Sequence, residues 1–270
     1  MEEAVIRRLA EQIYQAEMTH TPIPAFTENG YPDMSYEDAY RIQLAAVALK
    51  QAAGQRVVGK KIGLTNLAVQ AYRGIHEPDY GHITDGVLAG QDRPITPAQL
   101  TGVPNIECEL AFVLKHDLSG PGVTAGQVLA CTLGVLPAIE VVERRFWPLC
   151  KSVKDSICDN AACGKVVLGS KLTDVMGLDF RTVGVVVEKN GLPIDTACSS
   201  TVYGNPVESV AWLANKLAEY GVSLRAGEII LSGSITMMHE AAPGECIYAH
   251  FGNGIGTVKV CFAKENKEGA

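Results

Sequence analysis

The chain has 270 residues, of which 47% are hydrophobic and 20% are charged, the composition of an ordinary globular protein with room for a large core. Its formal net charge of -7 argues against nucleic acid as a main partner. No apolar run approaches the ~20 residues that cross a bilayer, and the acidic start Met1-Glu2-Glu3 is unlike a signal peptide, so we expect no membrane partner.

The eight cysteines show no C-x-x-C motif and no paired metal spacing. Several lie in apolar, strand-like segments, where cysteine acts as a small hydrophobic residue. We therefore expect free thiols, which indicate a reducing cytoplasm.

Two amphipathic segments at the start of the chain are predicted to form helices. Apolar residues recur at helical spacing between Glu2 and Glu17. After a proline-rich loop, Ser35 and the acidic residues behind it are typical of a helix N-cap, and the helix that follows would run to Gln51. Residues 1–55 are therefore predicted to form a small helical subdomain appended to the main body.

The pattern changes at Arg56 and becomes richer in strands. The segment from Val57 to Thr65 predicts a strand that runs into a glycine-marked turn, with Lys61 as an interior lysine; a solvated surface lysine is the alternative. A short helix from Leu67 to Tyr72 and a polar loop from His76 to His82 would follow. This loop holds Asp79, and it either connects two elements or forms the wall of a site.

The most unusual stretch is the predicted strand from Ile106 to Val113, because it carries two acids in an apolar setting. Side chains alternate along a strand, so Glu107 and Glu109 face the same way. Their repulsion needs compensation unless this is the solvated face of an edge strand. Glu140 lies in a second apolar run, and three carboxylates brought together would suit Mg²⁺ or Mn²⁺ better than zinc.

The remainder of the chain is predicted to contain more strands than helices. The clearest elements are a hairpin turn at Asn190-Gly191, a helix from Pro206 to Tyr220, and closing strands from Cys246 to Phe251 and from Gly256 to Phe262. Because strands and helices do not alternate regularly, we expect an α+β fold with a mixed sheet over residues 56–264. Residues 265–270 are predicted to be a frayed tail.

Four features together resemble the fumarylacetoacetate hydrolase superfamily: Gly59-Lys60-Lys61-Ile62-Gly63-Leu64-Thr65, Glu107-Cys108-Glu109, Glu140, and Asp159-Asn160-Ala161. Within it, the chain is most similar to the 2-hydroxydienoate (2-keto-4-pentenoate) hydratases and to the 4-oxalocrotonate decarboxylases, over nearly its whole length. The resemblance implies a mixed β-sheet roll flanked by helices. It also implies ring-like homo-oligomers and leaves open a partner enzyme of the same pathway.

The resemblance assigns site residues as well. Glu107, Glu109 and Glu140 would hold one Mg²⁺ or Mn²⁺, Lys61 would be the active-site lysine, and Asp79 would be a wall or acid–base residue. The positive charge of the cation would lower the pKa of Lys61, so that this lysine could move a proton. The residues expected to contact the substrate are Thr65, Arg145, Asp159, Asn160 and Ser234.

Two lyase activities are compatible with this site. A hydratase would add water to a 2-hydroxy-2,4-dienoate to give a 4-hydroxy-2-oxo acid, as in the degradation of aromatic compounds, whereas a decarboxylase would remove CO₂ from 2-oxohex-3-enedioate. We favour the hydratase. A dicarboxylate substrate would need a cation at the far end of its pocket, and the candidates are Arg73, Arg144, Arg145 and Lys151.

Two other functions fit the sequence less well than these lyases. A C–C bond hydrolase would need a His–Glu pair to activate water, and the sequence offers no clear one. A non-catalytic binding protein would have little reason to retain Lys61 and all three glutamates.

Overall fold

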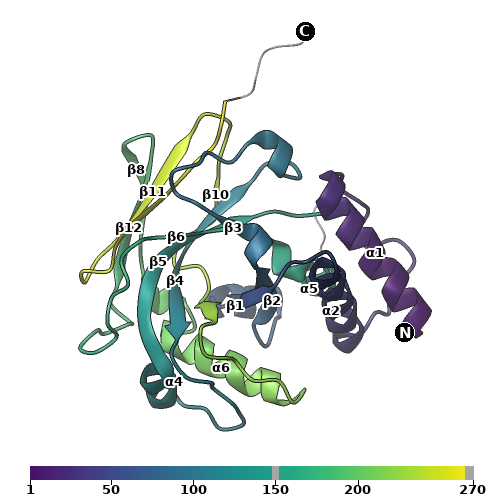
Figure 1. The fold of residues 1–270 in the computed structure, drawn as a ribbon, viewed down its shortest axis with the longest axis horizontal. Helices are drawn as coiled ribbons and strands as arrows, with labels where there is room; N and C mark the ends of the chain where they lie inside the picture. The colour runs from purple at the N-terminus through teal and green to yellow at the C-terminus, as the bar shows by residue number, and fades with distance from the viewer. Residues whose placement is uncertain (148–151, 265–270) are drawn as a thin grey trace.

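The computed structural model describes residues 1–147 and 152–264, which form two β-sheets with helices around them (Figure 1). Within these residues the larger sheet has eight strands. Their order is β2 (Asp79–Thr84), β1 (Val57–Gly63), β9 (Ile229–Leu231), β4 (Asn105–Leu114), β5 (Thr132–Val142), β6 (Cys163–Leu168) and β3 (Leu88–Ala89), with β10 (His239–Glu240) beside β4. The pairs β1–β9 and β3–β6 are parallel and the others antiparallel, which confirms the predicted mixed sheet.

The smaller sheet contains four strands among the described residues and packs against β5 and β6. Its order is β12 (Gly256–Cys261), β11 (Cys246–Phe251), β7 (Gly184–Lys189) and β8 (Leu192–Cys198). The predicted hairpin is confirmed, because Asn190 and Gly191 join β7 to β8 with left-handed φ angles of 53° and 83°. In Figure 1 this sheet covers the side of the molecule opposite the N-terminal helices.

Helices flank the larger sheet in two groups (Figure 1). The group beside β1 and β2 contains α1 (Glu3–Thr19), α2 (Tyr36–Ala52) and α5 (Val153–Cys158), and the remaining helices are α3 (Leu67–Arg73), α4 (Ala125–Cys131) and α6 (Pro206–Ala218). The predicted N-cap is confirmed, since the Ser35 hydroxyl accepts a hydrogen bond from the Asp38 amide at 3.0 Å. Of the described helices, none is both long and apolar enough to cross a lipid bilayer.

The N-terminal helices are tied to the sheet by one buried side chain. The Gln43 amide nitrogen in α2 donates to the Tyr80 carbonyl at 3.0 Å and to the Ile157 carbonyl at 2.8 Å, so it links α2 to β2 and α5. A single apolar cluster also runs from α1 through the sheet. The division of the chain at residue 55 stays a prediction.

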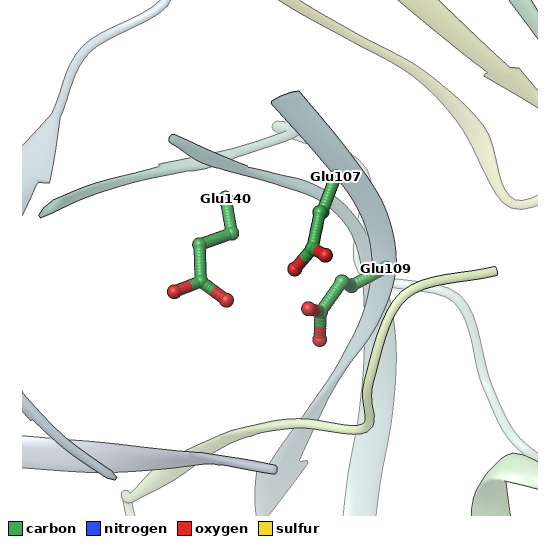
Figure 2. A group of neighbouring side chains, drawn as sticks. All are labelled: Glu107, Glu109 and Glu140. Carbon is green, nitrogen blue, oxygen red and sulfur yellow. The ribbon is translucent and has the colours of Figure 1, made fainter. Parts of the chain in front are cut away.

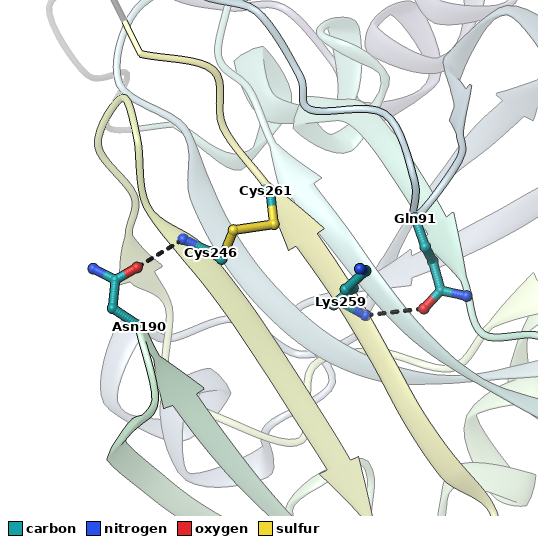
Figure 3. Close-up of a disulfide and its surroundings, with 5 residues drawn as sticks. All are labelled: Gln91, Asn190, Cys246, Lys259 and Cys261. Atoms are coloured by element: carbon teal, nitrogen blue, oxygen red, sulfur yellow. Dashed lines mark hydrogen bonds between the residues drawn. A yellow bond between two sulfur atoms is a disulfide. The ribbon is translucent and has the colours of Figure 1, made fainter.

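Two local predictions are wrong. Residues 79–82 belong to the fully buried strand β2 and not to a polar loop, because pairing with β1 covers their backbone and the sheet buries their side chains. Cys246 and Cys261 form a disulfide (Figure 3), because they stand directly opposite each other in the β11–β12 pair with their Cα atoms 4.1 Å apart. The expectation of free thiols therefore fails for this pair.

Candidate metal centre and active-site cavity

Strand pairing brings three glutamates together on one face of the larger sheet. Glu107 on β4 stands directly opposite Glu140 on β5, and Glu109 lies two residues further along the same face of β4. One carboxylate oxygen from each residue lies within 4.8 Å of the other two. Figure 2 shows the three carboxylates turned toward a common centre. The predicted convergence is confirmed, whereas the binding of a metal there stays a prediction.

The carboxylates need a positive charge to remain ionised together. Burial, and then the repulsion of Glu140, raises the pKa of Glu107 to about 7. Burial and the other two carboxylates raise the pKa of Glu109 well above its usual range, although the Gly233 amide donates to this carboxylate at 2.7 Å. Among the described residues, neither buried oxygen of Glu140 has a hydrogen-bond partner. All the potential metal ligands here are carboxylate oxygens, and their negative charge is not fully compensated. Such a site fits a hard divalent cation such as Mg²⁺ or Mn²⁺.

Lys61 is the one buried lysine beside these carboxylates in the described part of the chain. Its Nζ lies 2.8 Å from Glu140 Oε1 and donates a hydrogen bond to the Ala161 carbonyl at 2.7 Å. The side chain of its neighbour Lys60 points to the other face of β1, where it pairs with Glu228 at 2.7 Å. Strand alternation therefore decides which of the two adjacent lysines enters the site.

The carboxylates keep Lys61 charged. Burial alone would lower the pKa of this lysine, but the attraction of Glu140 and then of Glu107 outweighs burial and raises the pKa. The sequence led us to expect a lowered pKa next to a cation. A divalent cation bound among the carboxylates would oppose the increase in the pKa of Lys61 that the carboxylates cause.

Asp79 forms a second buried charge on the same face. It stands opposite Gly63 in the β1–β2 pair, and a Cβ atom at position 63 would lie only 2.2 Å from Asp79 Oδ1. Burial raises the pKa of Asp79 to about 6, while Lys61 opposes the increase. The Ser156 hydroxyl hydrogen-bonds to this carboxyl group, but its buried Oδ1 has no hydrogen-bond partner among the described residues. Asp79 is thus an acid that can change its protonation state near neutral pH.

These groups open onto a cavity of about 310 Å³, a size suited to a small molecule. Lys61, Asp79 and Glu107 contribute its charged lining near the glutamate cluster. The rest of the wall consists of Gly63, Leu64, Arg73, Val142, Arg144, Ser152, Val153, Ser156, Ala161, Ala162 and Met238. Ser152, Ser156 and Met238 were not anticipated from the sequence, because they follow no motif and reach the cavity only through the packing of α5 and the segment before β10.

Arg145 and Asp159, both predicted to contact substrate, form a buried pair with each other. The Arg145 amide donates to Asp159 Oδ2 at 2.9 Å, the guanidinium donates to Asp159 Oδ1, and Arg145 Nη1 donates to the Cys163 carbonyl at 2.8 Å. Neither residue lines the cavity, whereas the adjacent Arg144 does. The pair holds the segment between β5 and β6 in place, and a direct contact with substrate stays a prediction for both.

Asn160 shapes the cavity wall through the backbone. Its side chain accepts a hydrogen bond from the His82 amide at 2.7 Å and donates one to the His82 carbonyl at 2.8 Å. The Asn160 amide group thus replaces the backbone of a neighbouring strand as the partner of His82. Asn160, Ala161 and Ala162 all have left-handed φ angles, between 50° and 56°. Gly81 permits this approach, because a Cβ atom there would lie 2.4 Å from the Asn160 carbonyl oxygen. The strained turn aims the Ala161 carbonyl at Lys61.

Thr65 and Ser234 lie where the segment after β1 meets the segment after β9. Thr65 is buried, and a Cβ atom at Gly233 would lie 2.2 Å from its hydroxyl oxygen. The Ser234 hydroxyl donates to the Thr236 carbonyl at 2.9 Å. Both residues support the segment whose Gly233 amide binds Glu109, and their contact with a substrate stays a prediction. Lys151, a candidate for the far end of the pocket, lies outside the described residues.

Residues 57–263 match the family described as fumarylacetoacetate (FAA) hydrolase C-terminal. The chain belongs to this family. It is 39% identical over 263 residues to a 2-hydroxyhexa-2,4-dienoate hydratase of Comamonas testosteroni, covering 96% of this chain and 98% of that protein. It is 40% identical to a 4-oxalocrotonate decarboxylase of Pseudomonas sp. (strain CF600), covering 90% and 91% of the two chains.

A solved member of the FAA hydrolase family has nearly the same fold. The 4-oxalocrotonate decarboxylase from Pseudomonas putida G7, complexed with magnesium and adipate, superposes with a TM-score of 0.93 and 34% identity, covering 97% of this chain and 98% of that one. The predicted family and fold are therefore confirmed. The similar proteins include both hydratases and decarboxylases, so similarity alone does not separate these two lyase activities.

Proposed function

We propose that the protein is a Mg²⁺- or Mn²⁺-dependent hydratase that adds water to a 2-hydroxy-2,4-dienoate and forms a 4-hydroxy-2-oxo acid. The observation that carries the proposal is the convergence of Glu107, Glu109 and Glu140 beside Lys61, with Glu107 and Lys61 in the lining of one cavity. The hydratase from Comamonas testosteroni, which this chain matches over nearly its whole length, supports the choice of reaction.

The three glutamates would hold the cation. Their three negative charges exceed the two positive charges of the cation, and the positive charge of Lys61 would compensate the excess. When bound, a divalent cation supplies Lewis acidity toward the carboxylate and keto oxygens of a 2-oxo acid. Lys61 Nζ donates one hydrogen bond to the Ala161 carbonyl and forms an ion pair with the Glu140 carboxylate, so it retains N–H groups that can donate to a substrate oxygen. The lysine would thus favour the form of the substrate in which this oxygen carries negative charge.

Asp79 is the group best suited to move protons. The reaction needs a proton at the far carbon of the dienol, which gives an α,β-unsaturated ketone, and then the addition of water at the β position. Asp79 lines the cavity, its buried Oδ1 has no hydrogen-bond partner among the described residues, and its pKa of about 6 lets it accept and release a proton near neutrality. We assign it the role of general acid–base residue, oriented by the Ser156 hydroxyl.

The second candidate is a 4-oxalocrotonate decarboxylase, favoured by the 40% identity to the Pseudomonas sp. enzyme and by the fold of the P. putida G7 enzyme. A direct comparison separates the two. The purified protein with Mg²⁺ is incubated with 2-hydroxypenta-2,4-dienoate and, separately, with 2-oxohex-3-enedioate, while ultraviolet absorbance and CO₂ release are followed. A hydratase consumes the dienoate without CO₂. Release of CO₂ from the dicarboxylate, with the dienoate left unchanged, would establish the decarboxylase instead.

We further propose that the enzyme acts as a homo-oligomer in the cytoplasm. Apolar side chains on its surface, including Val103, Met176 and Leu192, support association with further copies of the chain. The free thiols of the buried Cys108 and Cys163 support a reducing compartment, whereas the Cys246–Cys261 disulfide does not. Analytical ultracentrifugation of the purified chain tests the oligomer, and fractionation of the native cells tests the location.

A further inference from the structure

A buried glutamine behind the cavity joins the two segments that carry Asp79 and Ser156. Gln43, on α2, has none of its surface exposed, and its Nε2 donates to the Tyr80 carbonyl at 3.0 Å and to the Ile157 carbonyl at 2.8 Å. Tyr80 follows Asp79 on β2, and Ile157 follows Ser156 on α5. One nitrogen atom therefore holds the residue after the acid and the residue after the hydroxyl that hydrogen-bonds to this acid.

Strand β2 lies at the edge of the larger sheet, so the backbone groups on its outer side need partners from elsewhere. Side chains supply them: Gln43 binds the Tyr80 carbonyl, and Asn160 binds the amide and the carbonyl of His82. Figure 1 shows α2 and α5 beside this strand. Over residues 1–147 and 152–264, no backbone–backbone hydrogen bond runs directly from β2 to α5. The Gln43 amide thus ties together two backbones that do not bind each other.

The orientation of the Gln43 amide is fixed by its three partners. Because Nε2 faces two carbonyl groups, the side-chain oxygen Oε1 faces His82 Nδ1, at 3.1 Å. Burial lowers the pKa of His82 to about 3, so the imidazole is neutral and its Nδ1 carries the proton that Oε1 accepts. Rotation of the amide by half a turn would set its oxygen against two carbonyl oxygens. Gln43 therefore has one fully hydrogen-bonded orientation.

The contact between Asp79 and Ser156 is the one that depends on the placement of α5. Asp79 itself is fixed to β1 by strand pairing. The other ionisable groups whose charges interact with Asp79 lie on β1, β4, β5 and α2, and they are Lys61, Glu107, Glu140 and Tyr40. A shift of α5 against β2 would leave the strand-borne groups in place and would first change the hydrogen bond from Ser156.

We propose that Gln43 is a positioning residue for the reaction, which keeps the Ser156 hydroxyl on the Asp79 carboxyl group by fixing α5 against β2. The inference rests on the proposed function, in which Asp79 moves the protons. The alternative is that Gln43 only satisfies two buried carbonyl groups. That alternative predicts a loss of stability on substitution, with no effect on Asp79.

The direct test measures the ionisation of Asp79 without turnover. Protein labelled with ¹³C at the aspartate carboxyl carbons and loaded with Mg²⁺ is titrated by NMR, and the resonance that is missing in Asp79→Asn is that of Asp79. The Ser156 contact lowers the pKa of this group, so Ser156→Ala should move the titration midpoint upward by about 1 to 2 pH units. Gln43→Met, which has a side chain of similar size without an N–H donor, should move it in the same direction.

The double variant decides whether Gln43 acts through Ser156. Its midpoint should equal that of Ser156→Ala alone, because one hydrogen bond can be lost only once. Displacements that add up in the double variant, or an unchanged midpoint in folded Gln43→Met, would overturn the proposal. Gln43→Asn keeps the amide on a side chain one methylene shorter, which cannot reach both carbonyls, and it carries the same expectation if Gln43→Met does not fold.

A matched control is Asn215→Leu, which removes another amide that joins two segments. The Asn215 side chain accepts from the Val123 amide at 2.8 Å and donates to the Val123 carbonyl at 3.0 Å, and neither residue lines the cavity. This variant should lower the free energy of unfolding and leave the midpoint of Asp79 unchanged. An equal displacement of the midpoint in the control would show a general effect of losing an internal amide and would overturn the role of Gln43.

Turnover then distinguishes failure of this inference from failure of the proposed function. With 2-hydroxypenta-2,4-dienoate, Gln43→Met should lower kcat by about 10- to 100-fold with little change in KM, the loss typical of a misplaced reacting group. A wild-type kcat in this variant would overturn the positioning role and leave the hydratase intact. No hydration by the wild type, together with the expected NMR displacements, would overturn the hydratase and leave the link from Gln43 to Asp79 intact.

Discussion

The buried carboxylate cluster makes the stability of the cation-free protein depend on pH in an unusual direction. Glu107 has a pKa of about 7 in the folded chain, against an ordinary value of 4.5. A raised carboxyl pKa means that the folded state holds its proton more tightly than the unfolded state does. The contribution of the protonated Glu107 carboxyl group to folding stability is therefore complete below pH 4.5 and is lost as the pH rises through 7.

The size of this effect follows from the two pKa values. One pKa unit corresponds to about 1.4 kcal/mol, so between pH 5.5 and pH 8.0 Glu107 by itself should reduce the free energy of unfolding by about 2 kcal/mol. Asp79, whose pKa is raised to about 6 by burial, acts in the same direction. Bound Mg²⁺ should remove the penalty, because it binds the ionised carboxylates and releases their protons.

Urea unfolding at pH 5.5 and 8.0, with EDTA or with excess Mg²⁺, measures this dependence. In EDTA we expect lower stability at pH 8.0 than at pH 5.5, and a larger gain from Mg²⁺ at pH 8.0. The Glu107→Gln variant keeps the shape of the side chain but cannot titrate, so its loss between the two pH values should be smaller by about 2 kcal/mol. If the variant and the wild type showed the same pH dependence in EDTA, the half-buried Glu107 would not titrate with a raised pKa and our account of the centre would be refuted.

Three further predictions test other parts of the site and the fold. Lys61→Ala should retain Mg²⁺ binding in calorimetry but reduce kcat by about 10²- to 10³-fold, the loss typical of one donor to a developing negative charge, and a fully active variant would exclude Lys61 from the reaction. Gly63→Ala should displace Asp79, since the new Cβ would lie 2.2 Å from its Oδ1; unchanged activity in a folded variant would argue against the position of this acid. Reduction of Cys246–Cys261, which closes a loop of 15 residues, should lower the free energy of unfolding by about 3 kcal/mol and leave kcat unchanged; thiol titration that finds both cysteines free beforehand would contradict the pairing.

The elements that the sequence predicts well are those with a local physical cause. Ser35 begins a helix because its own hydroxyl accepts the Asp38 amide three residues later. Asn190 and Gly191 make a tight hairpin because both adopt left-handed φ angles at little cost. Glu107 and Glu109 share a face because side chains alternate along any strand. Each of these causes acts within a few residues.

The composition of the site depends on contacts that sequence spacing does not encode. Register between β4 and β5 sets Glu140 opposite Glu107, and register between β1 and β2 brings Asp79 to the same face as Lys61. Our expectation of a polar loop at Asp79 failed because the polar composition of residues 76–82 conceals a strand that pairing with β1 buries.

Arg144 and Arg145 show most clearly that the sequence does not predict which side chain reaches the site. From the sequence we expected Arg145 to contact the substrate and named Arg144 only as a candidate for the far end of the pocket. The fold turns Arg145 inward to the buried Asp159 and leaves Arg144 on the cavity wall. Likewise, only the pairing of β11 with β12 brings Cys246 opposite Cys261. The sequence by itself determined the family, the strand that carries two glutamates and the need for a cation. The tertiary structure decided which charges face the substrate, because burial and pairing across distant segments determine where each side chain points.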